Sequence, residues 1–286
     1  MNILVTGASG FIGSYLVARL KRDGHSILEH RSTDGNLIDR SSLDRYENVD
    51  AVYHLAARTY VPESWEMPYE YINDNNTILT NVLEFCRKHG CRMVFVSTYL
   101  YGEPEYLPVD EKHRCVTTTP YHLCKKIGED ICEFYSRNFG VDIAVFRPFN
   151  VYGKGQNRDF LLPKVYYQVA DGSADTIEVF NLTPKRDYVY VEDLVDALAR
   201  ILAHISGFDV YNVGSGRSYS VKEAIDIIQK ELGTNKQIIE KYSLRKNEVM
   251  DCYADITHLE EVIGKVSITS IEDGIHKWHL LEDEGD

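Results

Sequence analysis

"NILVTGASGFIGSYLVARLKRDG", residues 2–24, joins a short apolar run to a longer amphipathic run through a loop with three glycines. Within the longer run Ile12, Leu16 and Leu20 recur at helical spacing, and Gly24 stands where a C-terminal helix cap is expected. The stretch therefore predicts a strand, a glycine turn and a helix, the unit from which parallel α/β sheets are built.

The glycine loop also predicts a dinucleotide site. Gly7, Gly10 and Gly13 fall between the predicted strand and helix. There the backbone can approach a ligand closely, and the helix start offers free N–H groups to a phosphate. Three glycines alone are a weak signal, and a tight turn without a ligand is the alternative. Their position between strand and helix favours the dinucleotide.

Short apolar runs alternate with helical patterns through the first half of the chain, which indicates βαβ units and a parallel sheet covered on both faces. We expect an α/β fold, a Rossmann-type doubly wound parallel sheet with a smaller mixed α/β substrate-binding lobe. The further expected strands are 26–30, 50–56, 92–97 and 141–148, and the expected helices are 75–90, 120–140, 221–233 and 256–264. The expected dinucleotide-binding domain comprises 1–152 and 184–212, and the expected substrate lobe comprises 153–183 and 213–286.

The composition restricts the partners. The 286 residues carry a formal net charge of −13 without a run of Lys or Arg, which opposes binding to nucleic acid and to anionic membranes. Six cysteines without a CxxC pair indicate free thiols in a reducing compartment, and no segment has the length of a membrane span. His276 and His279 of "HKWH" lack further ligands at a known metal spacing. We expect a cytoplasmic protein with no nucleic-acid, membrane or metal partner.

The end of the second predicted strand bears on the choice of cofactor. An NAD site usually has an acidic residue there for the ribose 2′-hydroxyl. In "LEHRST", residues 28–33, Arg31 stands at about that position with Ser32 and Thr33 beside it, which suits the extra phosphate of NADP. Glu29 lies close enough to leave NAD open. The sequence predicts NADP or NAD, with NADP slightly favoured because of Arg31.

"TTTPYHLCKKIGED", residues 117–130, contains the candidate catalytic pair Tyr121 and Lys125. Pro120 favours a first helical turn and Thr119 can cap it, so the pair is expected one turn apart on one face. The same side is expected to carry Cys124, Ile127, Ile131 and Phe134.

The spacing of this pair has little weight alone, because about one YxxxK match is expected by chance. A second match at 242–246 lies in a polar stretch without a preceding strand and helix start. The chemistry supports the first match. Hydride transfer at a hydroxyl requires a proton to move, and a tyrosine base must have its pKa lowered by roughly 3 units, about 4 kcal/mol, to act at neutral pH. A lysine cation one turn away and an oxidised nicotinamide both act in that direction.

Several further segments of the chain occur in the same order as in one known protein family. They are "TGASGFIG", "HLAA", "NDNNTILTNVL", "STYLYG", "PYHLCKK", "RPFNVYG", "KRDYVYVEDLVDA", "YNVGSGRSYSV" and "LRKNEVMDCYADI". Together they resemble the extended short-chain dehydrogenase/reductases, specifically the NAD(P)-dependent nucleotide-sugar epimerase/dehydratase family, over nearly the whole chain. The resemblance implies a nucleotide-diphosphate sugar as substrate.

The resemblance also implies residue roles. Tyr121 is the expected acid/base, Lys125 is expected to bind the nicotinamide ribose and lower the tyrosine's pKa, and Thr98 is the expected assisting hydroxyl. The expected cofactor contacts are Gly7, Ser9, Gly10, Phe11, Ile12, Gly13, Arg31, Asn36, Leu37, Leu55, Ala56, Ala57, Tyr121 and Lys125. The expected substrate contacts are Tyr99, Asn150, Arg186 and Arg245.

The arginines suit a diphosphate because a guanidinium fork matches phosphate oxygens. For Arg186 a surface ion pair with Asp187 or Glu192 is the alternative.

Two departures from the family pattern affect these roles. "STYLYG" is one residue shorter than usual before Tyr-Gly, so Ser97 is the alternative to Thr98. The 4,6-dehydratases of the family carry an Asp-Glu pair after this hydroxyl, whereas this chain has Tyr99 and Leu100, neither of which can shuttle that proton. The resemblance therefore implies chemistry other than dehydration.

We expect an NAD(P)-dependent enzyme that transfers hydride at a ring carbon of a nucleotide sugar, as a 4-epimerase. An NADPH-dependent nucleotide-4-keto-sugar reductase is the nearest alternative, and a non-catalytic dinucleotide sensor is a remote one. The resemblance further implies a homodimer formed through the helix that carries Tyr121 and its neighbour.

Overall fold

The computed structural model describes residues 1–241 and 248–283. A six-stranded, fully parallel sheet forms the larger half, in the order β2-β1-β3-β4-β5-β9. Its strands are β1 (Asn2–Thr6), β2 (Ser26–His30), β3 (Ala51–His54), β4 (Arg92–Val96), β5 (Ile143–Pro148) and β9 (Phe208–Val213). This sheet confirms the predicted α/β fold class.

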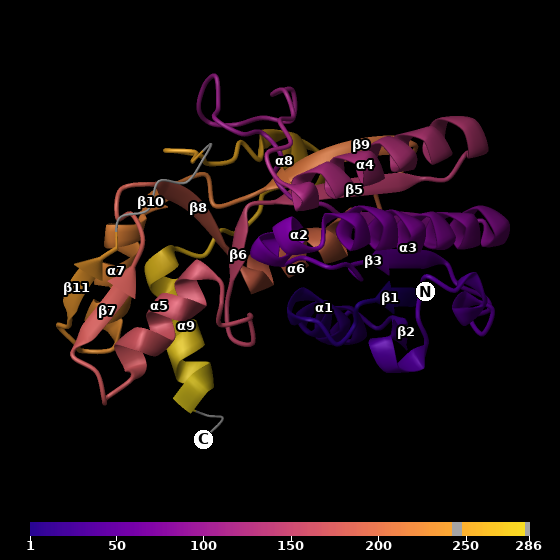
Figure 1. Cartoon of the computed structure of the whole chain (residues 1–286). Helices are drawn as coiled ribbons and strands as arrows, with labels where there is room; N and C mark the ends of the chain where they lie inside the picture. The colour runs from indigo at the N-terminus through magenta and orange to yellow at the C-terminus, as the bar shows by residue number, and fades with distance from the viewer. Residues whose placement is uncertain (242–247, 284–286) are drawn as a thin grey trace.

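Helices cover both faces of the sheet (Figure 1). One face is covered by α1 (Phe11–Arg22) and α6 (Val191–Ile201), and the other by α2 (Val61–Glu66), α3 (Pro68–His89) and α4 (Pro120–Phe139). Side chains of a strand point to alternate faces, so Ile3 and Val5 pack with α1 and α6 while Leu4 packs with α3. Both faces of the sheet are therefore apolar, as a buried parallel sheet requires.

The strand order places β2 at the edge of the sheet. Residues between β2 and β3 form only two short turns, η1 (Ser32–Asp34) and η2 (Arg40–Leu43). The order is thus the doubly wound 2-1-3-4-5 arrangement, extended by β9. The chain switches sides between β1 and β3, and ligands of such sheets bind at that switch point, beyond the carboxyl ends of the strands. The glycine loop follows β1 directly at this point.

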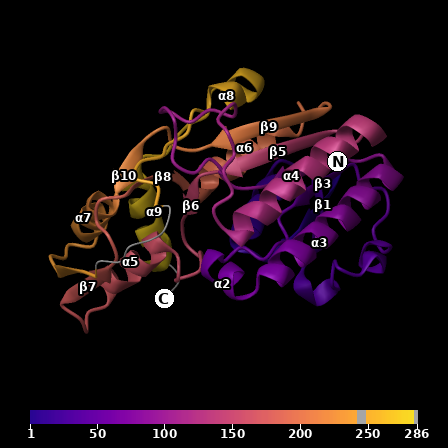
Figure 2. The same cartoon turned by 45° about the horizontal axis from the view of Figure 1, so that its top comes forward.

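A smaller half lies beside the sheet. It contains a three-stranded sheet, β10-β8-β6, and a two-stranded parallel sheet of β11 and β7. The elements are β6 (Asn150–Tyr152), α5 (Leu161–Ala170), β7 (Thr176–Val179), β8 (Lys185–Tyr190), β10 (Ser218–Ser220), α7 (Val221–Glu231), β11 (Gln237–Glu240) and α9 (Ile271–Asp283). A further helix, α8 (Thr257–Ile263), packs against β9 of the larger sheet (Figure 2). Because the small sheet takes strands from both expected domains, their boundaries remain a proposal.

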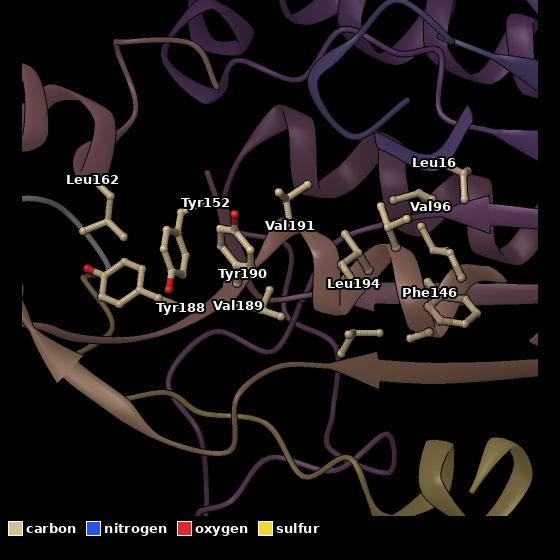
Figure 3. Packing of buried hydrophobic residues seen from close by; sticks show 14 of the residues in the cluster. Leu16, Val96, Phe146, Tyr152, Leu162, Tyr188, Val189, Tyr190, Val191 and Leu194 are labelled. Atoms are coloured by element: carbon tan, nitrogen blue, oxygen red, sulfur yellow. The ribbon is translucent and has the colours of Figure 1, made fainter. Parts of the chain in front are cut away.

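One hydrophobic core runs through both halves. Figure 3 shows Tyr152, Tyr188 and Tyr190 beside Leu162 of the smaller half, in the same cluster as Leu16, Phe146 and Leu194 of the larger half. The two halves are therefore packed together through a shared apolar junction.

Helix α4 begins as predicted. Thr119 Oγ1 accepts a hydrogen bond of 3.0 Å from the His122 N–H, and Pro120 occupies the first turn. The predicted apolar side was wrong at Phe134, which is 55% exposed. The buried stripe runs instead through Gly128 and Cys132, because α4 packs so closely on α3 that a Cβ at Gly128 would lie 3.0 Å from Leu79. Lys125 lies on this buried stripe.

The six cysteines are free thiols. None of the helices in 1–241 and 248–283 is long and apolar enough to cross a membrane. His276 pairs with Glu231 at 2.7 Å, and His279 Nδ1 lies 3.1 Å from the Tyr166 hydroxyl. The two histidines of "HKWH" thus have partners within the protein.

Candidate active site

A cleft of about 1470 Å³ opens beyond the carboxyl ends of the parallel strands and extends to the smaller half. It collects residues that lie far apart in the sequence. The predicted site residues that line it are Gly7, Ser9, Gly10, Phe11, Ile12, Gly13, Arg31, Asn36, Leu37, Leu55, Ala56, Ala57, Ser97, Thr98, Tyr99, Tyr121, Lys125, Asn150 and Arg186. Arg245 lies outside the described residues.

The glycine loop has the geometry of a phosphate cradle. Gly7 has φ +71°, and a Cβ there would lie 2.8 Å from the Ala56 nitrogen. A Cβ at Gly13 would lie 2.1 Å from the Gly7 oxygen, so any side chain would push α1 away from the loop. Helix α1 starts at Gly10 without a side-chain cap, which leaves N–H groups for an anion. The loop therefore fits a dinucleotide diphosphate.

At the end of β2 the Arg31 guanidinium borders the cleft and pairs with Glu29 at 2.5 Å. Glu29 also pairs with Lys21 at 2.7 Å. Hydrogen bonds from Lys21, which has the larger effect, and from Arg31 lower the pKa of Glu29. Arg31 is half exposed, so it can turn toward a phosphate, but Glu29 competes for it.

Tyr121 and Lys125 face the cleft from the first turns of α4. Lys125 Nζ donates a 2.8 Å hydrogen bond to the Val96 carbonyl and lies 5.9 Å from the centre of the Tyr121 ring. Burial lowers the pKa of Lys125 from 10.5 to about 8. Lys125 is therefore mostly a cation at neutral pH.

The pKa of Tyr121 differs from the sequence-based requirement for a base. Burial raises it above 10, and a hydrogen bond with Thr98 opposes this only in part. In the protein alone, Tyr121 thus holds its proton at neutral pH, because burial outweighs the other influences.

The structure separates the two candidate hydroxyls. Thr98 lies close enough to Tyr121 to lower the pKa of its phenol. Ser97 also borders the cleft, but it is 3% exposed and its Oγ donates to Glu129 Oε1 at 2.6 Å. The geometry favours Thr98 as the hydroxyl near a reacting oxygen.

Asn150 is held by two partners in the part of the cleft that borders the smaller half. The Tyr99 hydroxyl donates to Asn150 Oδ1 at 3.3 Å, and Asn150 Nδ2 donates to the Asp187 carbonyl at 2.9 Å. The Tyr99 ring stacks on Phe149 with ring centres 4.8 Å apart. One N–H of the Asn150 amide is left for a ligand.

Arg186 forms no ion pair within the described residues. Its Nη1 donates to the Val249 and Lys185 carbonyls at 2.6 and 2.7 Å. The Asp187 carboxylate instead accepts from backbone N–H groups, including that of Ala254 at 3.0 Å. The alternative of a surface ion pair is therefore not what the structure shows, and Arg186 borders the cleft as a cation without a counterion there.

Residues 3–214 match the NAD dependent epimerase/dehydratase family. The chain belongs to this family. A UDP-glucose 4-epimerase of Corynebacterium glutamicum is 34% identical over 82% of this chain and 81% of its own length. A UDP-glucose 4-epimerase of Yersinia enterocolitica is 30% identical over 100% and 99%.

Solved structures that resemble this epimerase/dehydratase family member support the same family relationship. A UDP-glucose 4-epimerase of Thermotoga maritima with UDP-glucose has a TM-score of 0.93 at 26% identity and covers 100% of both chains. RMD from Pseudomonas aeruginosa, complexed with NADPH, has a TM-score of 0.88 at 28% identity over 98% of this chain and 99% of its own.

Many of the residues that border the cleft were not predicted from the sequence, and four of them carry groups that a ligand would meet. They are His122, Phe180, Tyr188 and Glu248. Burial lowers the pKa of His122 to about 4, so it is neutral at pH 7. The Tyr188 hydroxyl is buried without a hydrogen-bond partner in the described part of the chain. His122 and Glu248 lie inside segments that carry the family resemblance, which was the one available signal for them.

Proposed function

We propose that the protein is a nucleotide-sugar 4-epimerase that acts on a UDP-sugar with a nicotinamide dinucleotide bound at the glycine loop. One observation carries this proposal: Tyr121, Lys125 and Thr98 converge at the end of β4 in a cleft that also holds a phosphate cradle and Arg186, which has no ion-pair partner among the described residues. Support comes from relatives named as UDP-glucose and UDP-arabinose 4-epimerases.

We assign substrate binding to the part of the cleft that borders the smaller half of the protein. Arg186 and Asn150 bind the diphosphate, because a guanidinium and an amide N–H both donate to phosphate oxygens. Arg245 is also assigned to bind the diphosphate, on the basis of its sequence segment alone. These contacts orient the sugar toward Tyr121.

The proton transfer is assigned to Tyr121. In the first half-reaction its phenolate takes the proton of the sugar 4-hydroxyl while Thr98 hydrogen-bonds to the same oxygen. A dinucleotide held at the glycine loop would supply the acceptor for the C4 hydride and, when oxidised, a positive charge. After the 4-keto sugar rotates, Tyr121 returns the proton to the ketone oxygen as hydride is added to the other face, so no net oxidation occurs.

Positive charge controls this step. Burial alone keeps Tyr121 protonated, and a nearby cation favours the phenolate. Lys125 supplies one such charge. Tyr121 is therefore an acid in the protein alone and becomes a base when further positive charge enters the cleft.

A second candidate is an NADPH-dependent reductase of a nucleotide 4-keto sugar. Arg31 favours it, since this guanidinium borders the cleft where an NAD site usually has a carboxylate. For either reaction we infer that the cofactor is NADP or NAD, with a slight preference for NADP from Arg31.

We further propose a homodimer formed through α3 and α4. Three apolar side chains of α4, Leu123, Phe134 and Phe139, are 40–55% exposed and are available to pack against a second copy. Phe134→Glu should convert a dimer to a monomer in light scattering. A wild-type monomer contradicts this assembly.

The test begins with the dinucleotide that leaves the purified protein on denaturation, identified by mass spectrometry. Stoichiometric dinucleotide, together with interconversion of UDP-glucose and UDP-galactose without added cofactor, is expected for the epimerase. An empty site that then consumes NADPH only with a 4-keto sugar supports the reductase. Cofactor binding without turnover of any nucleotide sugar would revive a sensor.

A further inference from the structure

Two consecutive residues at the end of β4 hydrogen-bond to two positions on α4, and the third residue lies beside the helix. The Val96 carbonyl accepts from Lys125 Nζ at 2.8 Å, and Ser97 Oγ donates to Glu129 Oε1 at 2.6 Å. The next residue, Thr98, lies beside Tyr121 and lowers the pKa of its phenol. Tyr121, Lys125 and Glu129 are spaced by four residues, one above the other on the same face of α4. The end of β4 is therefore attached to α4 at two positions one helical turn apart, next to Tyr121.

Glu129 is held by a buried ion pair. Arg147 Nε and Nη2 donate to its two carboxylate oxygens at 3.0 and 2.6 Å, and the two side chains are only 4% and 7% exposed. Arg147 Nη1 continues to the Tyr101 hydroxyl at 3.0 Å, which donates to Asn212 Oδ1 at 2.5 Å. The carboxylate thus has three donors and is linked to β5 and β9.

The contribution of this network to the stability of the fold does not explain why it is present. A buried ion pair contributes little net stability, because desolvation offsets most of the attraction. Glu129 of this pair lies one helical turn from Lys125 on α4. It also accepts a hydrogen bond from Ser97, the residue directly before Thr98. Its location indicates a role in holding these two groups at fixed positions.

We propose that Ser97, Glu129 and Arg147 are positioning residues for proton transfer: they fix Thr98 against Tyr121 and keep the Lys125 cation in place. This inference rests on the proposed acid/base role of Tyr121. It assigns a function to Ser97 other than contact with the sugar, and it explains why the hydroxyl of a cleft-lining serine is directed to a buried carboxylate.

The charge of Glu129 also acts on Lys125. The titratable groups that face Lys125 are Tyr121, Cys124, Glu129 and Cys132 on α4 and His54 on β3. Burial keeps the two thiols, the phenol and His54 neutral near pH 7. Glu129 is then the anion among these described groups, and it stabilises the ammonium form of Lys125.

The test uses Ser97→Ala and Glu129→Gln in the full chain with bound dinucleotide. Ser97→Ala removes one donor but leaves the ion pair, and it should lower kcat by about tenfold with KM within about twofold. Glu129→Gln should move the alkaline limb of kcat to lower pH by about one unit, because Lys125 loses its stabilising anion. Ser136→Ala, a buried serine near the other end of α4, is the control and should match wild type.

The outcomes separate the two proposals. Wild type without epimerase activity overturns the proposed function itself. An active wild type with Ser97→Ala and Glu129→Gln at wild-type kcat and pH profile overturns the positioning role. A structural role alone would lower the melting temperature without changing kcat per bound dinucleotide.

If Glu129→Gln does not fold, a double variant still tests the inference. The single variant leaves Arg147 as an unpaired buried cation, which strongly destabilises a fold. The double variant Glu129→Gln/Arg147→Met removes both charges and should fold. It is expected to lower kcat by about tenfold at unchanged KM, and a wild-type kcat in this double variant contradicts the inference.

Discussion

Lys125 Nζ lies 5.9 Å from the centre of the Tyr121 ring and is hydrogen-bonded to the Val96 carbonyl rather than to a carboxylate. The lysine is thus held beside the phenol, with no direct counterion in 1–241 and 248–283. Its cation remains available to act on the pKa of Tyr121 and on a ligand in the cleft. In the proposed mechanism, the rate therefore depends on the protonation of both residues.

The first prediction concerns pH. Burial lowers the pKa of Lys125 to about 8, so its ammonium form is present below that pH and is lost above it. The rate of epimerisation should therefore fall as pH rises through about 8. Lys125→Met should lower kcat roughly 100-fold and lose this limb. A wild-type rate that stays constant from pH 7 to 10 contradicts the role of the cation.

The second prediction concerns the cofactor. Arg31→Asp should weaken NADP binding by about tenfold or more relative to NAD, since a charge-assisted hydrogen bond contributes about 1.5–3 kcal/mol. Glu29→Gln should have the opposite effect, because Arg31 loses the carboxylate that now holds it at 2.5 Å. Dissociation constants measured by calorimetry decide this. Arg40→Asp is the matched control, as Arg40 pairs with Glu84 away from the cleft.

The third prediction concerns Tyr99. Tyr99→Phe removes the hydroxyl that donates to Asn150 but keeps the ring on Phe149. KM for the UDP-sugar should rise about fivefold with kcat nearly unchanged, since one hydrogen bond contributes roughly 0.5–1.5 kcal/mol. If kcat falls instead while KM stays constant, Tyr99 acts in the chemical step and not through Asn150.

The fourth prediction concerns the glycine loop. Gly13→Ala should destabilise the protein by about 1–3 kcal/mol and abolish dinucleotide binding, because the added Cβ would lie 2.1 Å from the Gly7 oxygen. Denaturant unfolding and fluorescence titration measure the two effects. Gly172→Ala is the control, since nothing lies within 4 Å of its Cβ position. Equal stability of the two variants would rule out the close approach of α1 to the loop.

Local sequence signals predicted the parts of the fold that depend on neighbouring residues. Thr119 and Pro120 begin α4 as expected, because caps act over three or four residues. Strand β2 has the predicted bounds. Five strands of the large sheet, β1 to β5, and the glycine positions of the cleft followed from periodicity and motif spacing, whereas strand β9 was not predicted.

The remainder depends on contacts between distant segments, for which the sequence carries no local signal. The pairing of Ser97 with Glu129 and Arg147 joins three elements. The exposure of Phe134 follows from the close packing of α4 on α3 at Gly128, which apolar spacing does not reveal. The raised pKa of Tyr121 likewise reflects burial, a property of the folded chain.

The most direct test of the account measures interconversion of UDP-glucose and UDP-galactose by NMR for wild type and Tyr121→Phe, each with its bound dinucleotide quantified. We predict that wild type reaches an equilibrium mixture without consuming cofactor. Tyr121→Phe should retain the dinucleotide and lose roughly 10²–10⁴-fold in kcat, the usual contribution of a general acid/base. Near wild-type turnover by Tyr121→Phe would contradict the assignment of proton transfer to this residue.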